Sequence, residues 1–192
     1  MKTTSLFVEL IVIGIGATLG ISLLLLAVFD SNLEILGAFA KINSLLLTAI
    51  GIAIVYPIGI IIDRVADRML SRSTTAIRKK VFSDREFVLA GIVDIYTNSS
   101  PLVDMIEYGR SRMRICRGWL IDVVLIFIGG NVYLVAAKSA GFEEALLFSL
   151  FCVLLWCGFY FAWQNLTFKG FEKISGISQI LRKNNHTKSP KK

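Results

Sequence analysis

Histidine and closely spaced cysteines are almost absent from this sequence. The one histidine, His186, stands in a polar stretch, and the three cysteines, Cys116, Cys152 and Cys157, form no Cys-x-x-Cys pair. Structural zinc sites are built from four Cys or His ligands at short spacings. We therefore expect neither a metal site nor a cofactor in this chain.

The sequence also lacks the residue sets of enzymes and ion-coupled transporters. It holds no Ser-His-Asp arrangement and no paired carboxylates beside a nucleophile. Transporters carry ionisable groups deep in the membrane, whereas the apolar stretches here contain only Glu9, Asp122 and Asn131 as notable polar residues. Glu9 and Asp122 lie near the ends of their stretches, where they can pair with cations, and the central Asn131 can join helices. We expect a protein that is not an enzyme.

Long apolar runs are what the sequence has in abundance. Hydrophobic residues make up 55% of the chain and the mean hydropathy is +0.67, values that exclude an ordinary soluble domain. A helix needs about 20 apolar residues to cross a bilayer. The first run is too long for the apolar region of a secretion signal, so we expect it to be retained. Four runs predict membrane-spanning helices: Leu6–Phe29, Leu45–Ile62, Leu120–Ala137 and Ala145–Trp163.

The cations alternate from one connection to the next. Nineteen of the 21 Lys and Arg residues lie in the N-terminal segment, in residues 63–118 or after Trp163, and only Lys41 and Lys138 lie in the other two connections. Cytoplasmic segments of membrane proteins carry the excess of Lys and Arg. The pattern predicts a multi-pass protein of the bacterial inner membrane with both termini in the cytoplasm. The net charge of +7 is explained by this topology, and no direct contact with nucleic acid is expected.

The expected fold is all-α and falls into four parts. Residues 1–62 hold the first two spans, 63–118 a basic cytoplasmic loop, 119–164 the other two spans, and 165–192 a cytoplasmic helix and tail. In the tail, Phe168, Phe171, Ile174, Ser178 and Leu181 recur at helical spacing among lysines and arginines. This pattern is typical of an amphipathic helix that lies on an anionic membrane or packs on a partner. Residues 184–192 are polar, and we expect them to be disordered.

Helix-start signals indicate that the basic loop is folded. Ser83 and Glu86 fit a capping box that precedes an apolar run. Ser100 and Pro101 fit the N-cap and first position of a second helix, which we expect to run toward Arg117 and into the third span. The loop is therefore predicted to be a small helical unit.

Two features within the spans have both a functional and a purely structural interpretation. Gly16 and Gly20 form a Gly-x-x-x-Gly pair, which favours close helix contact, either with another copy of the chain or within one chain. Pro57 and Gly59 stand near the end of the second span, where proline bends a helix. Such a bend can serve as a hinge for a gate or can simply shape the helix.

Charged residues cluster on both sides of the basic loop. Asp63-Arg64 and Asp67-Arg68 follow the second span at a spacing of four and are expected to prolong it as a helix. The second cluster precedes the third span and consists of Arg110, Arg112, Arg114 and Arg117. Guanidinium groups bind carboxylates and phosphates through two hydrogen bonds, so the possible targets of this cluster are lipid phosphate, the Asp63/Asp67 stripe or an acidic partner. Alternatively, the cluster only anchors the topology of the chain.

In overall architecture the chain resembles the KwaA family, the membrane component of the bacterial Kiwa anti-phage system. The resemblance is based on four spans, about 190 residues, cytoplasmic termini and a basic loop between the second and third spans. It implies a homo-oligomeric inner-membrane sensor that recruits a soluble DNA-binding effector, KwaB. No residue role is carried over from the family.

Two functional hypotheses follow from the sequence. The first is a sensor or scaffold that contacts membrane lipids, assembles as a homo-oligomer through Gly16 and Gly20 (a tetramer is one option) and binds a cytoplasmic effector protein through the two charged clusters. The second is a pore-forming effector that depolarises the membrane, with Gly51, Pro57 and Gly59 at its gate and Asn131 in its lumen. A third, a lipid-handling accessory protein, would use the arginines on lipid headgroups.

Overall fold

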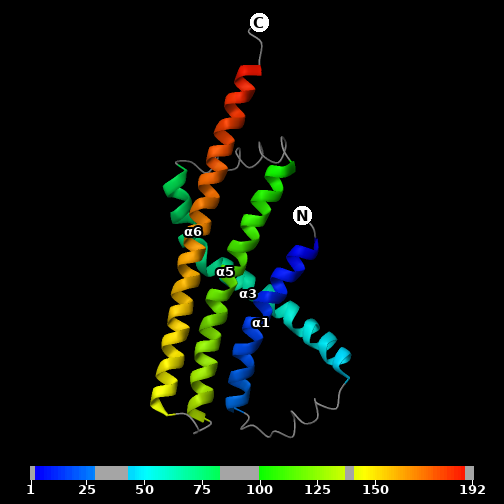
Figure 1. Ribbon diagram of the computed structural model, residues 1–192, viewed down its shortest axis with the longest axis vertical. Helices are drawn as coiled ribbons and strands as arrows, with labels where there is room; N and C mark the ends of the chain where they lie inside the picture. Colours follow the sequence, from blue (N-terminus) through cyan, green and yellow to red (C-terminus); the bar gives the residue numbers. More distant parts are fainter. Residues whose placement is uncertain (1–2, 29–42, 83–99, 137–140, 189–192) are drawn as a thin grey trace.

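A computed structural model describes residues 3–28, 43–82, 100–136 and 141–188, and nearly all of them are helical (Figure 1). Within these ranges there are four helices, each long and apolar enough to cross a membrane. They are α1 (Thr3–Val28), α3 (Ser44–Val81), α5 (Ser100–Ala136) and α6 (Phe142–Lys188). Apart from Phe29 and Ala137, which lie outside the described residues, the four predicted spans each lie within one of these helices.

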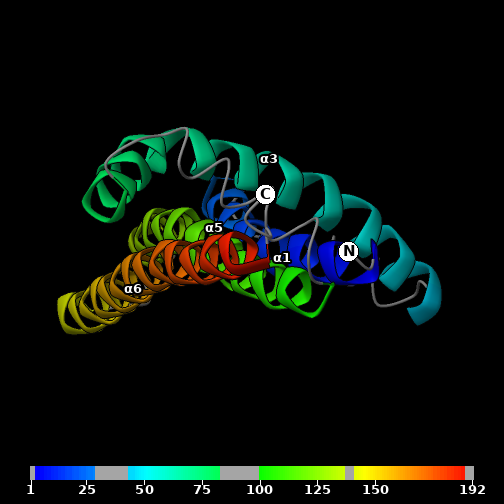
Figure 2. The same ribbon diagram turned by 90° about the horizontal axis from the view of Figure 1, so that it is seen from above.

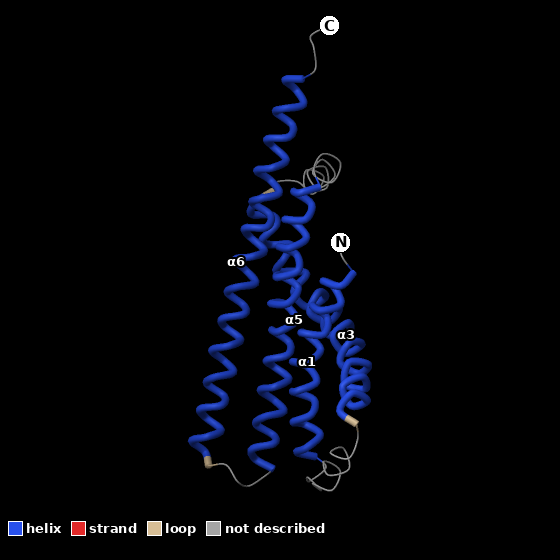
Figure 3. Tube along the Cα trace, turned by 45° about the vertical axis from the view of Figure 1, so that its right-hand side comes forward, coloured by secondary structure: helices blue, strands red, loops and turns tan. Residues whose placement is uncertain are grey.

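The helices form an open bundle with α5 between α1 and α6. Helix α5 packs on both of these neighbours, and α3 packs mainly on α1 while its later turns reach α5 and α6. In Figure 1, α3 crosses α1 obliquely, and the view from above in Figure 2 shows that α3 follows a curved path over the other helices. Figure 3 shows α1, α5 and α6 side by side.

Three of the helices are much longer than a bilayer is thick. Helices α3, α5 and α6 contain 38, 37 and 47 residues, which corresponds to roughly 55–70 Å against about 30 Å of hydrocarbon. Each boundary expected between spans and cationic segments therefore falls inside an unbroken helix. We call the cationic extensions the basic stem: residues 63–82 of α3, 100–118 of α5 and 164–188 of α6.

The second loop helix is confirmed, because α5 begins at Ser100 and continues without a break into the third span. The capping box at Ser83 and Glu86 lies outside the described residues. The expectation for the tail needs correction: residues 165–188 are helical and continue the fourth span directly, so they form no separate helix on a membrane surface. The apolar face finds its partner in the same chain, where Phe82, Ile106 and Ile174 form a buried cluster between α3, α5 and α6.

Glycines bring the spanning parts of the helices together. Gly14 of α1 lies against the backbone carbonyl of Val55, and Gly59 of α3 lies against that of Leu10, so α1 and α3 cross with their backbones in contact. Small residues allow this approach in lipid, where packing replaces the hydrophobic effect as the driving force. Gly59 is thus a packing residue at the crossing, whereas Pro57 is exposed within the continuous α3.

Gly16 and Gly20 are also buried inside the chain. A side-chain carbon on Gly16 would lie 2.7 Å from a carboxylate oxygen of Asp122, and one on Gly20 would lie 2.7 Å from the carbonyl carbon of Leu125. Both glycines therefore face α5 of their own chain. Of the two interpretations of this pair, the structure shows close contact within one chain.

The α1–α3 crossing gives a first prediction. Gly59→Ala should destabilise the protein, because the added methyl group meets the Leu10 carbonyl and forces the two helices apart, and overpacking of this kind costs ~1–3 kcal/mol. Thermal unfolding of the detergent-purified protein would measure the change. Gly51→Ala is the matched control, since nothing lies within 4 Å of that position on the same helix. Equal melting temperatures for the two variants would contradict the crossing.

Candidate functional site

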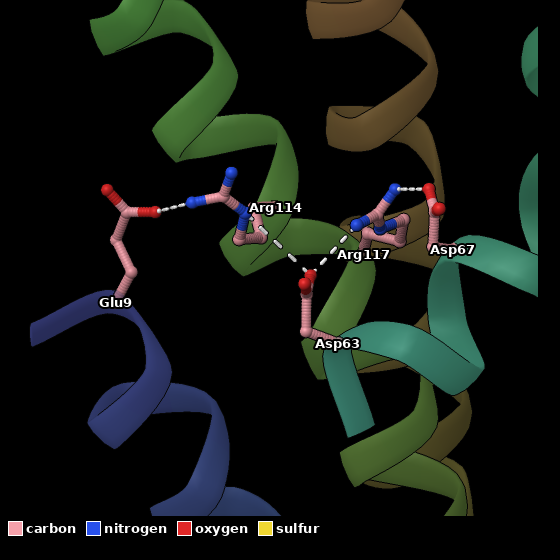
Figure 4. A network of polar contacts seen from close by, with 5 residues as sticks. All are labelled: Glu9, Asp63, Asp67, Arg114 and Arg117. Atoms are coloured by element: carbon pink, nitrogen blue, oxygen red, sulfur yellow. Dashed lines mark hydrogen bonds and ion pairs between the residues drawn. The ribbon is translucent and has the colours of Figure 1, made fainter. Parts of the chain in front are cut away.

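Charged side chains from three helices meet where the apolar spans pass into the basic stem. Helix α5 carries Arg114 and Arg117, which share a face because they are three residues apart. Helix α3 carries Asp63 and Asp67 at a spacing of four, and α1 carries Glu9. Figure 4 shows these five residues as one connected network.

Asp63 is the centre of this network. Its Oδ1 accepts a hydrogen bond from Nη2 of Arg117 at 2.8 Å and lies 3.8 Å from Nε of Arg114 (Figure 4). Arg117 also donates from Nη1 to Asp67, and Arg114 donates from Nη1 to Oε2 of Glu9 at 2.6 Å. One carboxylate thus links both arginines, and the two arginines connect α5 to α3 and α1.

The carboxylates at the centre are withdrawn from solvent. Glu9 is 2% exposed and Asp63 is 5% exposed, whereas Asp67 at the edge keeps 60% of its side chain exposed. A buried ion is stable only with a partner close by, and removing that partner costs several kcal/mol. Glu9 and Asp63 therefore depend on the arginines of α5, and the position of α1 relative to α3 is fixed through them.

The four arginines of the α5 cluster fall into two groups, one that binds carboxylates of the network and one that is exposed. Arg114 and Arg117 bind carboxylates of their own chain, so the Asp63/Asp67 stripe is the target of Arg117, one of the options that the sequence left open. Arg110 and Arg112 are exposed, and the Arg112 guanidinium lies 4.5 Å from the centre of the Tyr108 ring. On α3, Arg64 and Arg68 are exposed while the neighbouring aspartates turn toward α5.

The three polar residues within the spans, Glu9, Asp122 and Asn131, differ in the partners that surround them. The prediction that Glu9 pairs with a cation is confirmed by Arg114. Asp122 differs from expectation: it is fully buried against Gly16, and neither carboxyl oxygen has a hydrogen-bond partner in the described part of the chain. Asn131 joins helices as predicted, because its Oδ1 accepts a hydrogen bond from Ser149 of α6 at 3.0 Å.

Comparison of the chain with models of known protein families, with curated proteins and with solved structures finds no match. Across the described ranges, no three His, Cys, Asp or Glu residues are grouped in a way that could hold a metal ion. The groups that meet at the site are guanidinium and carboxylate groups in ion pairs.

The network gives a second prediction, for Asp63 and Arg117. Asp63→Asn and Arg117→Gln should each lower the free energy of unfolding by at most ~3–5 kcal/mol, because each removes the closest partner of a buried charge while Asp67 still contacts Arg117 and Arg114 still lies near Asp63. The double variant should cost less than the sum of the two. A double-mutant cycle from thermal or chemical unfolding in detergent would measure the coupling. Asp67→Asn is the control, and at its exposed position it should cost at most ~1 kcal/mol. Additive effects would contradict the pairing.

Proposed function

We propose that this protein is a non-enzymatic membrane sensor or scaffold that recruits a cytoplasmic protein. The observation that carries the proposal is the network centred on Asp63. It connects α1, α3 and α5 at the inner end of their spans, and α3 and α5 continue directly into the stem. A displacement of the spans therefore moves the stem, since breaking the buried pairs is costly.

The proposed location is the bacterial inner membrane with the stem and both termini in the cytoplasm. Support comes from the cations: the stem carries most of the Lys and Arg residues of the chain, and cytoplasmic segments are the ones enriched in them. The stem also offers the protein surface that extends beyond the apolar spans, because α3, α5 and α6 all contribute to it.

The docking surface in this proposal is narrower than the sequence predicted. Arg114 and Arg117 are engaged inside the chain, whereas Arg64 and Arg68 of α3 are exposed beside the aspartates that face α5. We define this docking surface as Arg64 and Arg68 of α3. Its charge fits an acidic surface on the recruited protein, which would be attracted and oriented by it.

Homo-oligomerisation is supported by the open packing of the spans. In the most apolar 18-residue stretch of α3, only 11% is buried within one chain, and in the corresponding stretch of α6 only 6% is buried. Lipid or further copies of the chain must cover these faces. With Gly16 and Gly20 turned toward α5, the contacts between copies would use α3 and α6 instead of α1.

The proposed biological setting is anti-phage defence, and it follows from the resemblance to the KwaA family. In that setting the recruited protein would be a DNA-binding effector of the KwaB kind. The pore hypothesis has less support, because Asn131, its expected lumen residue, is bonded to Ser149 between α5 and α6.

A third prediction tests recruitment. The double variant Arg64→Glu with Arg68→Glu should reduce the amount of co-purified cytoplasmic protein about tenfold or more, because it replaces attraction by repulsion at the docking surface. Mild-detergent affinity purification followed by quantitative mass spectrometry would measure this. The control is Lys79→Glu with Lys80→Glu, an equal charge change at exposed positions elsewhere on α3. Unchanged recruitment by the first variant, with normal membrane insertion, would contradict the docking surface.

A fourth prediction concerns assembly. Size-exclusion chromatography with light scattering, corrected for bound detergent, should give a protein mass of two or more chains of 21.3 kDa each. The uncovered apolar faces of α3 and α6 are the physical reason, because packing between helices is favourable in lipid. A mass of one chain, obtained in several mild detergents and in lipid nanodiscs, would contradict homo-oligomerisation.

A further inference from the structure

A cavity of about 470 Å³ lies between α5 and α6 in the stem, within the usual size range of ligand sites. Six cationic residues line it: Arg110, Arg112, Arg114 and Arg117 from α5, and Lys169 and Lys173 from α6. No Asp or Glu is among the described residues that line it. The sequence alone does not indicate this site, because the two lysines belong to a helix far from the arginines along the chain.

The positive charge of the cavity is only partly compensated. Arg114 and Arg117 bind Glu9, Asp63 and Asp67, which approach them from α1 and α3. Lys169 and Lys173 are exposed, and no ion pair with either is found among the described residues. Arg110 has an interaction partner within the chain, and the Arg112 guanidinium lies over the Tyr108 ring. Lys169 and Lys173 thus add positive charge without an ion pair to a site whose described lining holds no Asp or Glu, so an anionic ligand there would be favoured.

The inner wall of the cavity is apolar. Trp163 and Ile174 are 2% and 7% exposed, and Met113, Leu166 and Phe171 line the cavity with them. The hydroxyl of the buried Thr167 donates to the carbonyl of Trp163 at 2.7 Å and so is already satisfied. A ligand with an anionic group and an apolar or aromatic part would match both the cations and this wall.

The cavity begins where the fourth span ends. Trp163 is the last residue of that apolar run, and tryptophan is enriched at the membrane–water interface. Lys173 lies ten residues further along the same helix, which corresponds to about 15 Å. The cavity therefore reaches from the level of lipid headgroups into the aqueous side of the stem.

From these observations we infer that the cavity binds the phosphate group of an anionic ligand, held by Lys169 and Lys173 of α6 beside the arginines of α5. Guanidinium and ammonium groups are the side chains that bind phosphate. Two sources share this chemistry: the headgroup of an anionic phospholipid entering from the membrane, and a soluble phosphate compound such as a nucleotide. Binding would link α5 to α6 within the stem and does not depend on recruitment of a partner.

The experiment has one arm for each source. In the lipid arm, detergent-purified protein is mixed with phosphatidylglycerol or phosphatidylcholine, and retained lipid is measured by native mass spectrometry. In the soluble arm, the melting temperature is measured with and without ATP or inorganic phosphate, since a ligand that binds only the folded state raises it. Four forms are compared: the unaltered chain, Lys169→Ala with Lys173→Ala, Lys169→Arg with Lys173→Arg, and the control Lys79→Ala with Lys80→Ala.

The expected result is retention of phosphatidylglycerol over phosphatidylcholine, or stabilisation by a soluble phosphate compound. Either should fall about tenfold or more in the Lys169/Lys173 variant, because the two ammonium groups that hold the phosphate are gone. The Lys79/Lys80 control should behave as the unaltered chain, and Lys169→Arg with Lys173→Arg should restore binding. Absence of binding in both arms, or equal losses in the test and control variants, would overturn the inference.

Discussion

The arrangement of the helices depends on the carboxylate of Asp63. This single side chain is bound by Arg117 and lies close to Arg114, and through these arginines it is connected to Asp67 on its own helix and Glu9 on α1. The buried ions Glu9 and Asp63 would be unfavourable where they stand without the two arginines. Three helices therefore have one position relative to one another in which each of these buried carboxylates is paired.

The bundle is stabilised differently on the two sides of this network. Below it, in the spans, backbone contact at Gly14, Gly16, Gly20 and Gly59 holds the helices together, because lipid offers no hydrophobic effect between apolar surfaces. Above it, in the stem, the buried cluster of Phe82, Ile106 and Ile174 is what soluble proteins use to exclude water. The ion pairs occupy the transition between these two environments.

Much of the fold can be predicted from the sequence, because a bilayer imposes a simple requirement on length and hydropathy. The four apolar runs locate the spans, and the Ser100-Pro101 signal places the start of α5 within one residue. The continuity of α6 was missed because amphipathic spacing does not reveal which surface the apolar face meets. Phe171 and Ile174 meet α3 and α5 of their own chain.

The site could be predicted only in part, since charge patterns fix a face of a helix but not its neighbour. The spacing of Asp63 and Asp67 marks a stripe, yet only the crossing of α3 with α5 shows that it binds Arg117. Glu9 was expected to pair, but its partner, Arg114, is 105 residues away in sequence. Gly16 and Gly20 give the same signal whether they face their own chain or another copy.

The unbroken course of α6 also makes it a lever. Residues 164–188 continue the fourth span as one helix, without a loop that could absorb a change in its tilt. The arm beyond the apolar run is about 37 Å long, so that a tilt of about 10° would carry its far end roughly 6 Å sideways. A small change in the tilt of α6 would thus be magnified into a displacement as large as an amino-acid side chain.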